Sequence, residues 1–100
     1  MSRPARIGAQ RLYLGDRHQA KDRGLLRELQ IQSVVNCTPP RTVDPSAGCA
    51  NFFEQEALMH YHRVPIFDTQ AEDATGYLAG AAEFIESRLH YGGVLVHCNR

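Results

Sequence analysis

The last residues of the chain hold the feature that most constrains its fold and chemistry. The glycine pair 92–93 interrupts the preceding structure, and the apolar run Val94–Val96 after it is typical of a short buried strand. This strand ends on His97-Cys98. The carboxyl end of a buried strand is where α/β proteins usually place their chemistry. Since the thiolate is the nucleophile in cysteine enzymes, a reactive Cys98 needs surroundings that favour the ionised sulfur.

The other apolar runs predict strands that alternate with helices. Besides 94–97, short strands are expected at 6–10, 11–15, 31–36 and 60–65. One helix is expected at about 17–30, with Asp16 as its N-cap, and another at 74–91, with Asp73 as its N-cap. The order of these elements predicts an α/β fold, in which helices flank a central, mostly parallel sheet and strand 94–97 lies near its centre.

The helix at 74–91 has the clearest periodicity. Its apolar residues recur at the spacing of one continuous face: Leu78, Ala81, Ala82, Ile85 and Leu89. By contrast, prolines and Gly48 exclude regular structure over most of 38–51, which we interpret as a surface connection. We expect the phenylalanines that follow to hold a helical turn at about 51–58 against the core.

Composition excludes several classes of partner. The 100 residues make one small domain at most, and Lys plus Arg (11) balances Asp plus Glu (11), so no global field draws the chain to nucleic acid or a membrane. No apolar run reaches membrane-spanning length, and the N-terminus lacks a signal-peptide core. Three cysteines without paired spacing favour a reduced cytoplasmic or nuclear protein. His60 and His62 have no third ligand beside them, so we predict no metal and no other cofactor.

Residues 94–100, Val-Leu-Val-His-Cys-Asn-Arg, resemble the first half of the signature loop of dual-specificity phosphatases, a branch of the cysteine-dependent protein tyrosine phosphatases. The family pattern is His-Cys, five residues, Arg, then Ser or Thr. Arg100 lies two residues past Cys98, so it is not the arginine that clamps phosphate in this family. Further matches at 12–15, 34–36 and 64–68 fall in the family's order, so the resemblance covers nearly the whole chain.

The resemblance implies hydrolysis of phosphotyrosine and phosphoserine or phosphothreonine in proteins, through a cysteinyl-phosphate intermediate. Cys98 would be the nucleophile, and Asp68 would protonate the leaving oxygen. Asp73 is the competing candidate for that acid, although we interpret it as the N-cap of the next helix. The residues around the nucleophile, His97, Asn99 and Arg100, would contact the substrate. A phosphorylated protein, such as a kinase, is the implied partner, and the oligomeric state is left open.

The resemblance also implies that residues 1–100 form the N-terminal part of a single catalytic domain whose C-terminal helices are missing. We therefore expect a polypeptide of these residues alone to have negligible activity. Cys37, at the end of strand 31–36, would be a candidate redox partner of Cys98, although a buried inert thiol is the commoner outcome. A non-catalytic phosphatase-like module that binds a phosphoprotein or kinase is the alternative function. A rhodanese-like sulfur carrier ranks below it, because that reading leaves Asp68 unexplained.

Overall fold

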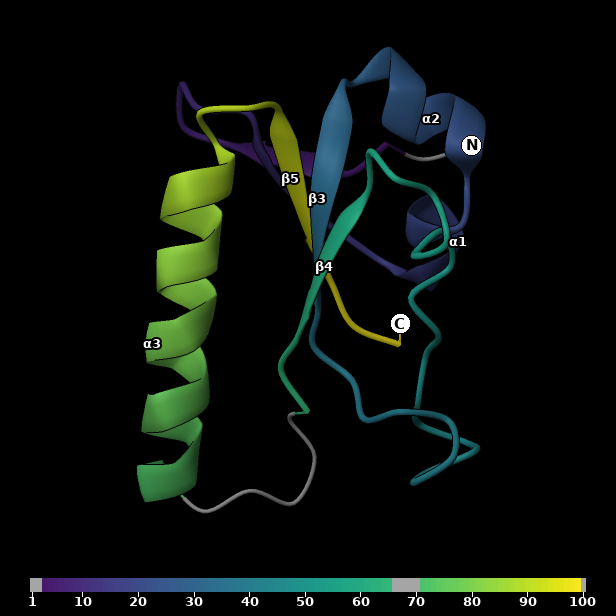
Figure 1. Cartoon of the computed structure of the whole chain (residues 1–100), viewed down its shortest axis with the longest axis vertical. Helices are drawn as coiled ribbons and strands as arrows, with labels where there is room; N and C mark the ends of the chain where they lie inside the picture. The colour runs from purple at the N-terminus through teal and green to yellow at the C-terminus, as the bar shows by residue number, and fades with distance from the viewer. Residues whose placement is uncertain (1–2, 66–70, 100) are drawn as a thin grey trace.

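A five-stranded sheet organises the chain in a computed structural model that describes residues 3–65 and 71–99, with side chains for 3–65 and 76–99 (Figure 1). The strands lie in the order β1-β2-β5-β3-β4. Their bounds are Ala5–Ile7 (β1), Leu12–Gly15 (β2), Ile31–Asn36 (β3), His60–Arg63 (β4) and Gly93–His97 (β5). Only β1 is antiparallel to its neighbour, and the other pairs are parallel. The predicted mostly parallel sheet, with the last strand at its centre, is therefore confirmed.

The single helix expected at 17–30 is two short helices, α1 (Arg17–Ala20) and α2 (Arg23–Glu28). Asp16 caps α1 as predicted, through its carboxylate and the Gln19 backbone N–H. The break comes from Asp22, whose carboxylate accepts the Leu25 N–H and so starts a second helix. An aspartate that binds the amides ahead of it competes with continued helix, which the apolar spacing alone did not reveal.

The long helix α3 (Ala71–Arg88) begins two residues before the predicted N-cap Asp73, which therefore lies inside the helix. Residues 51–58 form no helix, although Phe52 and Phe53 do pack against the core as expected. The backbone bonds of this segment, such as Glu56 N–H to Phe53 O at 3.0 Å, join residues three apart in a series of turns. No helix in the described part of the chain combines the length and the apolar character needed to cross a membrane.

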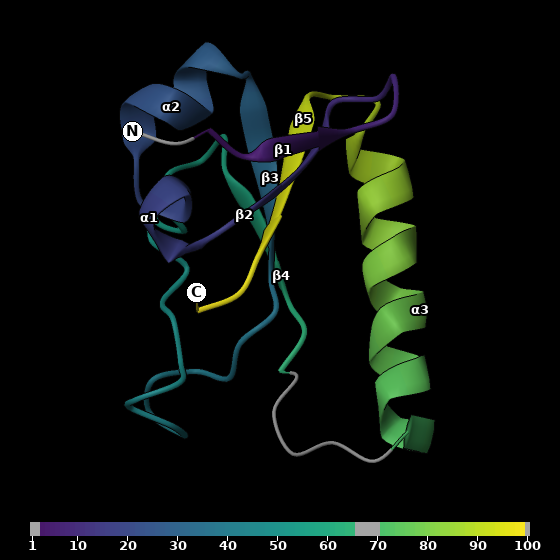
Figure 2. The same ribbon diagram turned by 180° about the vertical axis from the view of Figure 1, so that it is seen from behind.

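The sheet separates two layers (Figures 1 and 2). Helix α3 covers one face, and α1, α2 and the segments after β3 cover the other. The predicted apolar stripe of α3 is only partly buried, because Leu78 is 56% exposed and Ala82 is exposed. The first turns of α3 extend past the carboxyl ends of the strands (Figure 1).

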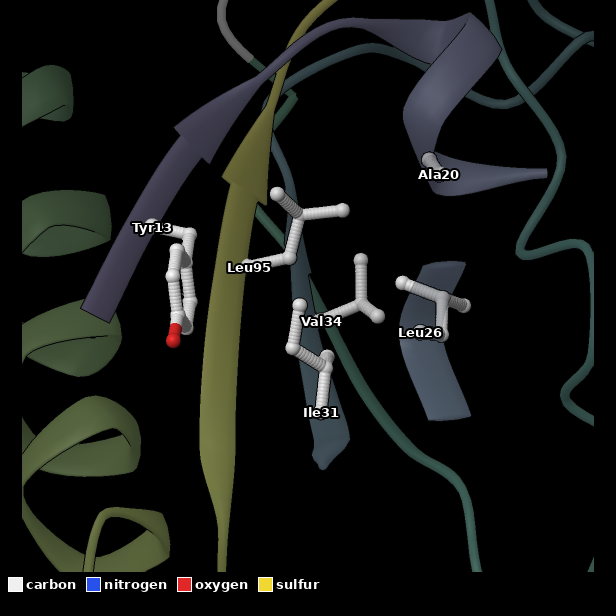
Figure 3. Close-up of a cluster of buried hydrophobic side chains, with 6 residues drawn as sticks. All are labelled: Tyr13, Ala20, Leu26, Ile31, Val34 and Leu95. Atoms are coloured by element: carbon white, nitrogen blue, oxygen red, sulfur yellow. The ribbon is translucent and has the colours of Figure 1, made fainter. Parts of the chain in front are cut away.

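Strand alternation divides the core into two clusters. The first faces α1 and α2 and contains six buried residues: Tyr13, Ala20, Leu26, Ile31, Val34 and Leu95 (Figure 3). The second faces α3 and contains four: Val35, Val64, Ala81 and Val94. Adjacent residues such as Val34 and Val35 belong to different clusters, because successive side chains of a strand point to opposite faces. The sheet is therefore buried on both sides, as expected for parallel strands.

Candidate functional site

Cys98 follows β5 directly, at the carboxyl edge of the sheet. Its side chain is exposed, whereas Cys37 is half-buried and Cys49 is buried, and all three are free thiols. The Cys37 N–H donates to the His97 carbonyl at 2.8 Å, so β3 and β5 still hold each other at the residue before Cys98. The exposed cysteine therefore follows directly after a strand that is paired on both sides, with β2 and β3.

His97 orients the backbone at Cys98. The imidazole is only 2% exposed, and its Nδ1 lies 2.8 Å from the Cys98 carbonyl oxygen. Because a carbonyl can only accept, Nδ1 carries the proton in this contact. Burial lowers the pKa of His97 and outweighs the opposite effect of the bond to the Cys98 carbonyl, and the nearby Arg63 guanidinium lowers the pKa further. The ring is thus neutral at physiological pH, and its Nε2 has no hydrogen-bond partner among the described residues.

The irregular segment 38–51 packs against this edge through the buried amide of Asn36. The amide Nδ2 donates to the Cys49 carbonyl at 3.1 Å and to Asn51 Oδ1 at 2.9 Å. The amide oxygen accepts the Thr38 hydroxyl at 2.7 Å, and that hydroxyl accepts the Cys49 N–H at 2.9 Å. A fully satisfied polar network of this kind fixes one conformation, so a segment without regular secondary structure is nonetheless held in place.

Arg63, the last residue of β4, completes the attachment. Its Nη1 donates to the carbonyls of Thr38 at 3.1 Å and Cys49 at 2.9 Å. Sequence reasoning missed Asn36, Thr38 and Arg63 as members of the site. Polar residues at the carboxyl ends of neighbouring strands were the available signal, since those ends meet at one edge of the sheet.

Asn99, predicted to contact the substrate, also contacts segment 38–51. Its Oδ1 lies 3.4 Å from Arg17 Nη1 and 3.4 Å from Cys49 Sγ, both of which can donate to it. Its Nδ2 donates to the Ser46 carbonyl at 3.1 Å. The residue after Cys98 is thus connected to both α1 and the loop. Its contact with a substrate stays a prediction.

The two less exposed thiols are poor candidates for nucleophiles. Burial raises the pKa of Cys37, and a neighbouring negative charge at Cys98 raises it further. Burial also raises the pKa of Cys49, with the guanidinium groups of Arg17 and Arg63 acting in the opposite direction. A thiol whose pKa is raised carries little thiolate at neutral pH. Exposure and position therefore single out Cys98 among the three.

Two predicted site residues, Asp68 and Arg100, lie outside the described residues. Val64 lies at the carboxyl edge of the sheet, the edge that carries Cys98, because its N–H donates to the Asn36 carbonyl at 2.8 Å. Asp68 follows four residues later in the sequence. Within the described ranges, no group of three or more His, Cys, Asp or Glu side chains could hold a metal ion.

The chain is similar in sequence to known proteins, although no family model matches it. Human dual specificity protein phosphatase 9 is 34% identical over 88 residues, which are 87% of this chain and 21% of that protein. Human dual specificity protein phosphatase 1 is 33% identical over the same shares of the two chains. The chain thus spans about a fifth of the length of the curated relatives it matches.

Solved structures give the same result. A variant of human DUSP28 superposes with a TM-score of 0.74 at 25% identity, over 100% of this chain and 62% of that one. A mouse dual specificity phosphatase in complex with zinc tungstate superposes with a TM-score of 0.67 at 25% identity, over 90% of this chain and 51% of that one. These similarities confirm the resemblance found in the sequence and the predicted fold class.

Proposed function

We propose that this dual-specificity-phosphatase-like chain is the N-terminal part of a catalytic domain that hydrolyses phosphotyrosine and phosphoserine or phosphothreonine in proteins. The observation that carries the proposal is the position of Cys98. The Cys98 side chain is exposed and follows the central parallel strand. The buried His97 ring donates a hydrogen bond to the Cys98 carbonyl and so holds the backbone at Cys98. The names of the relatives supply the reaction class.

The reaction takes place in two steps. The Cys98 thiolate attacks phosphorus, the bond from phosphorus to the ester oxygen breaks, and a cysteinyl phosphate forms. Asp68 gives its proton to the departing alkoxide or phenoxide. The Asp68 carboxylate then takes a proton from a water molecule that attacks phosphorus, which releases inorganic phosphate and restores the thiolate. The cysteine supplies the nucleophile, so this mechanism uses no metal-activated water.

The site must stabilise the negative charge on the transferred phosphoryl group. Phosphoryl transfer depends on fixed donors around the three transferred oxygens, because the protein does little covalent chemistry beyond the nucleophile. Consecutive loop amides and an arginine six residues after the cysteine would supply these donors. Residues 1–100 contain only Asn99 and Arg100 beyond Cys98. We propose that a polypeptide of these residues alone turns over phosphate esters negligibly.

The test compares turnover of a fluorogenic aryl phosphate, at mildly acidic pH, by the natural protein and by its Cys98→Ser variant. We expect the substitution to lower kcat by more than about a thousandfold, since a serine hydroxyl is far less nucleophilic than a thiolate at this pH. Cys49→Ser is the matched control and should keep turnover within about threefold. Equal turnover by wild type and Cys98→Ser would refute the assignment. Phosphopeptide binding without any turnover would favour the non-catalytic module instead.

The same assay tests Asp68 as the general acid. Asp68→Asn keeps the shape of the side chain but cannot donate the proton, so kcat should fall by about a hundredfold, within the range of general acid–base catalysis. The loss should be larger for alkyl phosphates, whose leaving groups need the proton more. Asp73→Asn serves as the control. If kcat fell in Asp73→Asn and not in Asp68→Asn, Asp73 would be the general acid.

Cys37 supports a proposal for oxidative regulation. Peroxide would oxidise the Cys98 thiolate to a sulfenic acid, and the Cys37 sulfur would then displace water to form a disulfide. The shared strand ends and the electrostatic coupling of the two thiols favour this pair. Peptide mapping after peroxide treatment of the natural protein should find Cys37 linked to Cys98. A Cys49–Cys98 link, or sulfinic acid at Cys98 without any disulfide, would contradict it.

The partner and compartment follow from the same reading. A phosphorylated protein is the proposed substrate, and a phosphorylated kinase is one such protein. Three free thiols, one of them exposed, suit a reducing compartment, so we propose the cytoplasm or nucleus. Fractionation of cells that express the tagged natural protein tests this placement, and recovery from the secreted fraction would exclude it.

A further inference from the structure

A hollow of about 450 Å³ lies at the amino end of the sheet, opposite the edge that carries Cys98. Its walls come from three parts of the chain: the end of α2, the turns before β4 and the residues that join α3 to β5. Figure 1 shows the start of β3 beside α2 at this end of the strands. We call this hollow the amino-edge groove. Among the described residues, no member of the Cys98 site contributes to its walls, so the proposed function leaves it unexplained.

The floor of the amino-edge groove is apolar, and its rim carries two exposed apolar side chains. Leu26 and Ile31 are buried, and the half-buried Met59 packs against their cluster. On the rim, Leu58 is 75% exposed and Tyr91 is 66% exposed. A single exposed apolar residue is ordinary, whereas two large ones beside an apolar hollow indicate a contact surface. The groove therefore suits a bulky aliphatic side chain.

The charges around the amino-edge groove are mostly positive. Arg11 and Arg27 line it, together with one carboxylate, that of Glu56. The Glu56 carboxylate is already paired with Arg23. Neither Arg11 nor Arg27 has an ion-pair partner among the described residues. Arg11 Nη1 donates to the neutral Gln30 Oε1 at 2.9 Å, which leaves the arginine charge uncompensated. The groove therefore offers two cations beside an apolar floor.

The walls of the amino-edge groove are held in one arrangement. Gln30 adopts a left-handed backbone conformation, with φ 55°, between α2 and β3. Its N–H donates to the Arg27 carbonyl at 3.1 Å, and its carbonyl accepts the Gly93 N–H at 2.7 Å. On the rim, the Arg88 guanidinium carbon lies 4.6 Å from the centre of the Tyr91 ring, a cation–π contact that orients the ring. A surface whose walls are already fixed loses little entropy when a ligand binds.

These features specify the occupant of the groove. Two uncompensated guanidinium groups favour carboxylates, through charge-assisted hydrogen bonds. A second copy of this chain is a poor occupant, because a two-fold dimer through this groove would bring Arg11 and Arg27 of one copy near the same residues of the other. Like charges at close range repel. The groove is therefore complementary to an acidic, aliphatic segment of another polypeptide.

We propose that the amino-edge groove is a docking site for an acidic segment of a partner polypeptide that carries a bulky aliphatic residue next to its carboxylates. The aliphatic side chain lies between Leu58 and Tyr91, and the carboxylates bind Arg11 and Arg27. The groove and the Cys98 edge are separated by the length of β3, whose six residues span about 20 Å. Docking therefore requires no chemistry at Cys98, and the inference goes beyond the proposed function.

Fluorescence anisotropy of a short, unphosphorylated peptide with two leucines beside two glutamates measures binding to the natural protein. We expect Arg27→Gln and Leu58→Ser each to weaken binding about tenfold, since each variant removes one charged or apolar contact. Peptides with glutamine in place of glutamate, or serine in place of leucine, should bind the wild-type protein equally weakly. The matched controls are Arg41→Gln and Val43→Ser, exposed residues of segment 38–51, which should keep the wild-type affinity.

Absence of peptide binding, or equal binding by the groove variants and the controls, would overturn the proposal. Two other occupants would also overturn it. Without peptide binding, a lower free energy of unfolding in both Arg27→Gln and Leu58→Ser would mean that another part of the same polypeptide covers the groove. A dimer in sedimentation that Leu58→Ser dissociates would assign the groove to a second copy. Cys98→Ser should leave peptide binding unchanged, so failure of the proposed phosphatase reaction is distinguishable from failure of docking.

Discussion

The two faces of the sheet end differently at the edge that carries Cys98. On the face toward α1 and α2, the apolar Val34 and Leu95 are followed two residues later by the buried polar Asn36 and His97. On the face toward α3, apolar packing continues through Val96. Alternation along a strand makes these independent surfaces. The first face therefore supplies the buried polar residues around the site, and the second mainly supports the sheet.

The difference shows how a small domain separates stability from chemistry. Polar side chains are buried only where neighbouring segments satisfy them, as Asn36 is by Thr38, Cys49 and Asn51. The α3 face has few such partners, with Arg88 Nε to Ser33 Oγ at 3.0 Å as one of them. Substitutions matched across the two faces can separate these roles.

The largest effect should come from the apolar interior. Leu95 is 0% exposed in the first cluster, whereas Leu89 is half-buried against the second. We expect Leu95→Ala to lower the free energy of unfolding by about 3–4 kcal/mol and Leu89→Ala by about 1–2 kcal/mol, since a cavity costs most where neighbours cannot collapse. Urea denaturation of the natural protein measures both. Equal losses would mean that the two faces pack equally tightly.

A smaller loss is expected from the polar end of the first face. Asn36→Ala removes the donor to Cys49 and Asn51 and leaves the Thr38 hydroxyl with one acceptor fewer. It should lower the free energy of unfolding by about 2–3 kcal/mol and speed amide exchange at Cys49. The control Ser33→Ala, which loses the bond from Arg88, should cost about 1 kcal/mol without affecting exchange at Cys49. Unchanged exchange in Asn36→Ala would show that other contacts hold the loop.

The smallest effect concerns pH. Burial places the pKa of His97 in the folded protein below the ordinary value of 6.5. Well above pH 6.5 the ring is neutral in both states, and as the pH falls through 6.5 toward the lowered folded pKa, the unfolded chain takes up the proton first. The free energy of unfolding should therefore decrease as the pH decreases across this window.

Urea midpoints at several pH values from 5 to 8 measure the slope, and His97→Asn should flatten it. The same substitution at the exposed His90 is the control. A slope that is unchanged in His97→Asn would assign the pH dependence to other groups.

Much of the fold was predictable because strand patterns are local. The run Val94–Val96 is short, apolar and rich in β-branched residues, which favours a buried strand, and the comparisons confirm the family resemblance that it suggested. The break between α1 and α2 was not predicted, because a capping aspartate such as Asp22 also fits inside a helix pattern. The exposure of Leu78 was not predicted either, because periodicity does not say where the sheet ends.

The sequence alone determined the alternation of strands and helices, the central place of the last strand and the identity of Cys98 as the candidate nucleophile. The alternation follows from side-chain chemistry and short-range spacing, and the other two follow from the order of the elements and the family resemblance. The tertiary structure decided which polar residues surround that cysteine. Asn36, Arg63 and Asn99 are far apart in the chain, and only the parallel pairing of β3, β4 and β5 brings their strand ends to one edge. Arg17 and Asn99 meet for the same reason, since the fold, and not the sequence order, places them together.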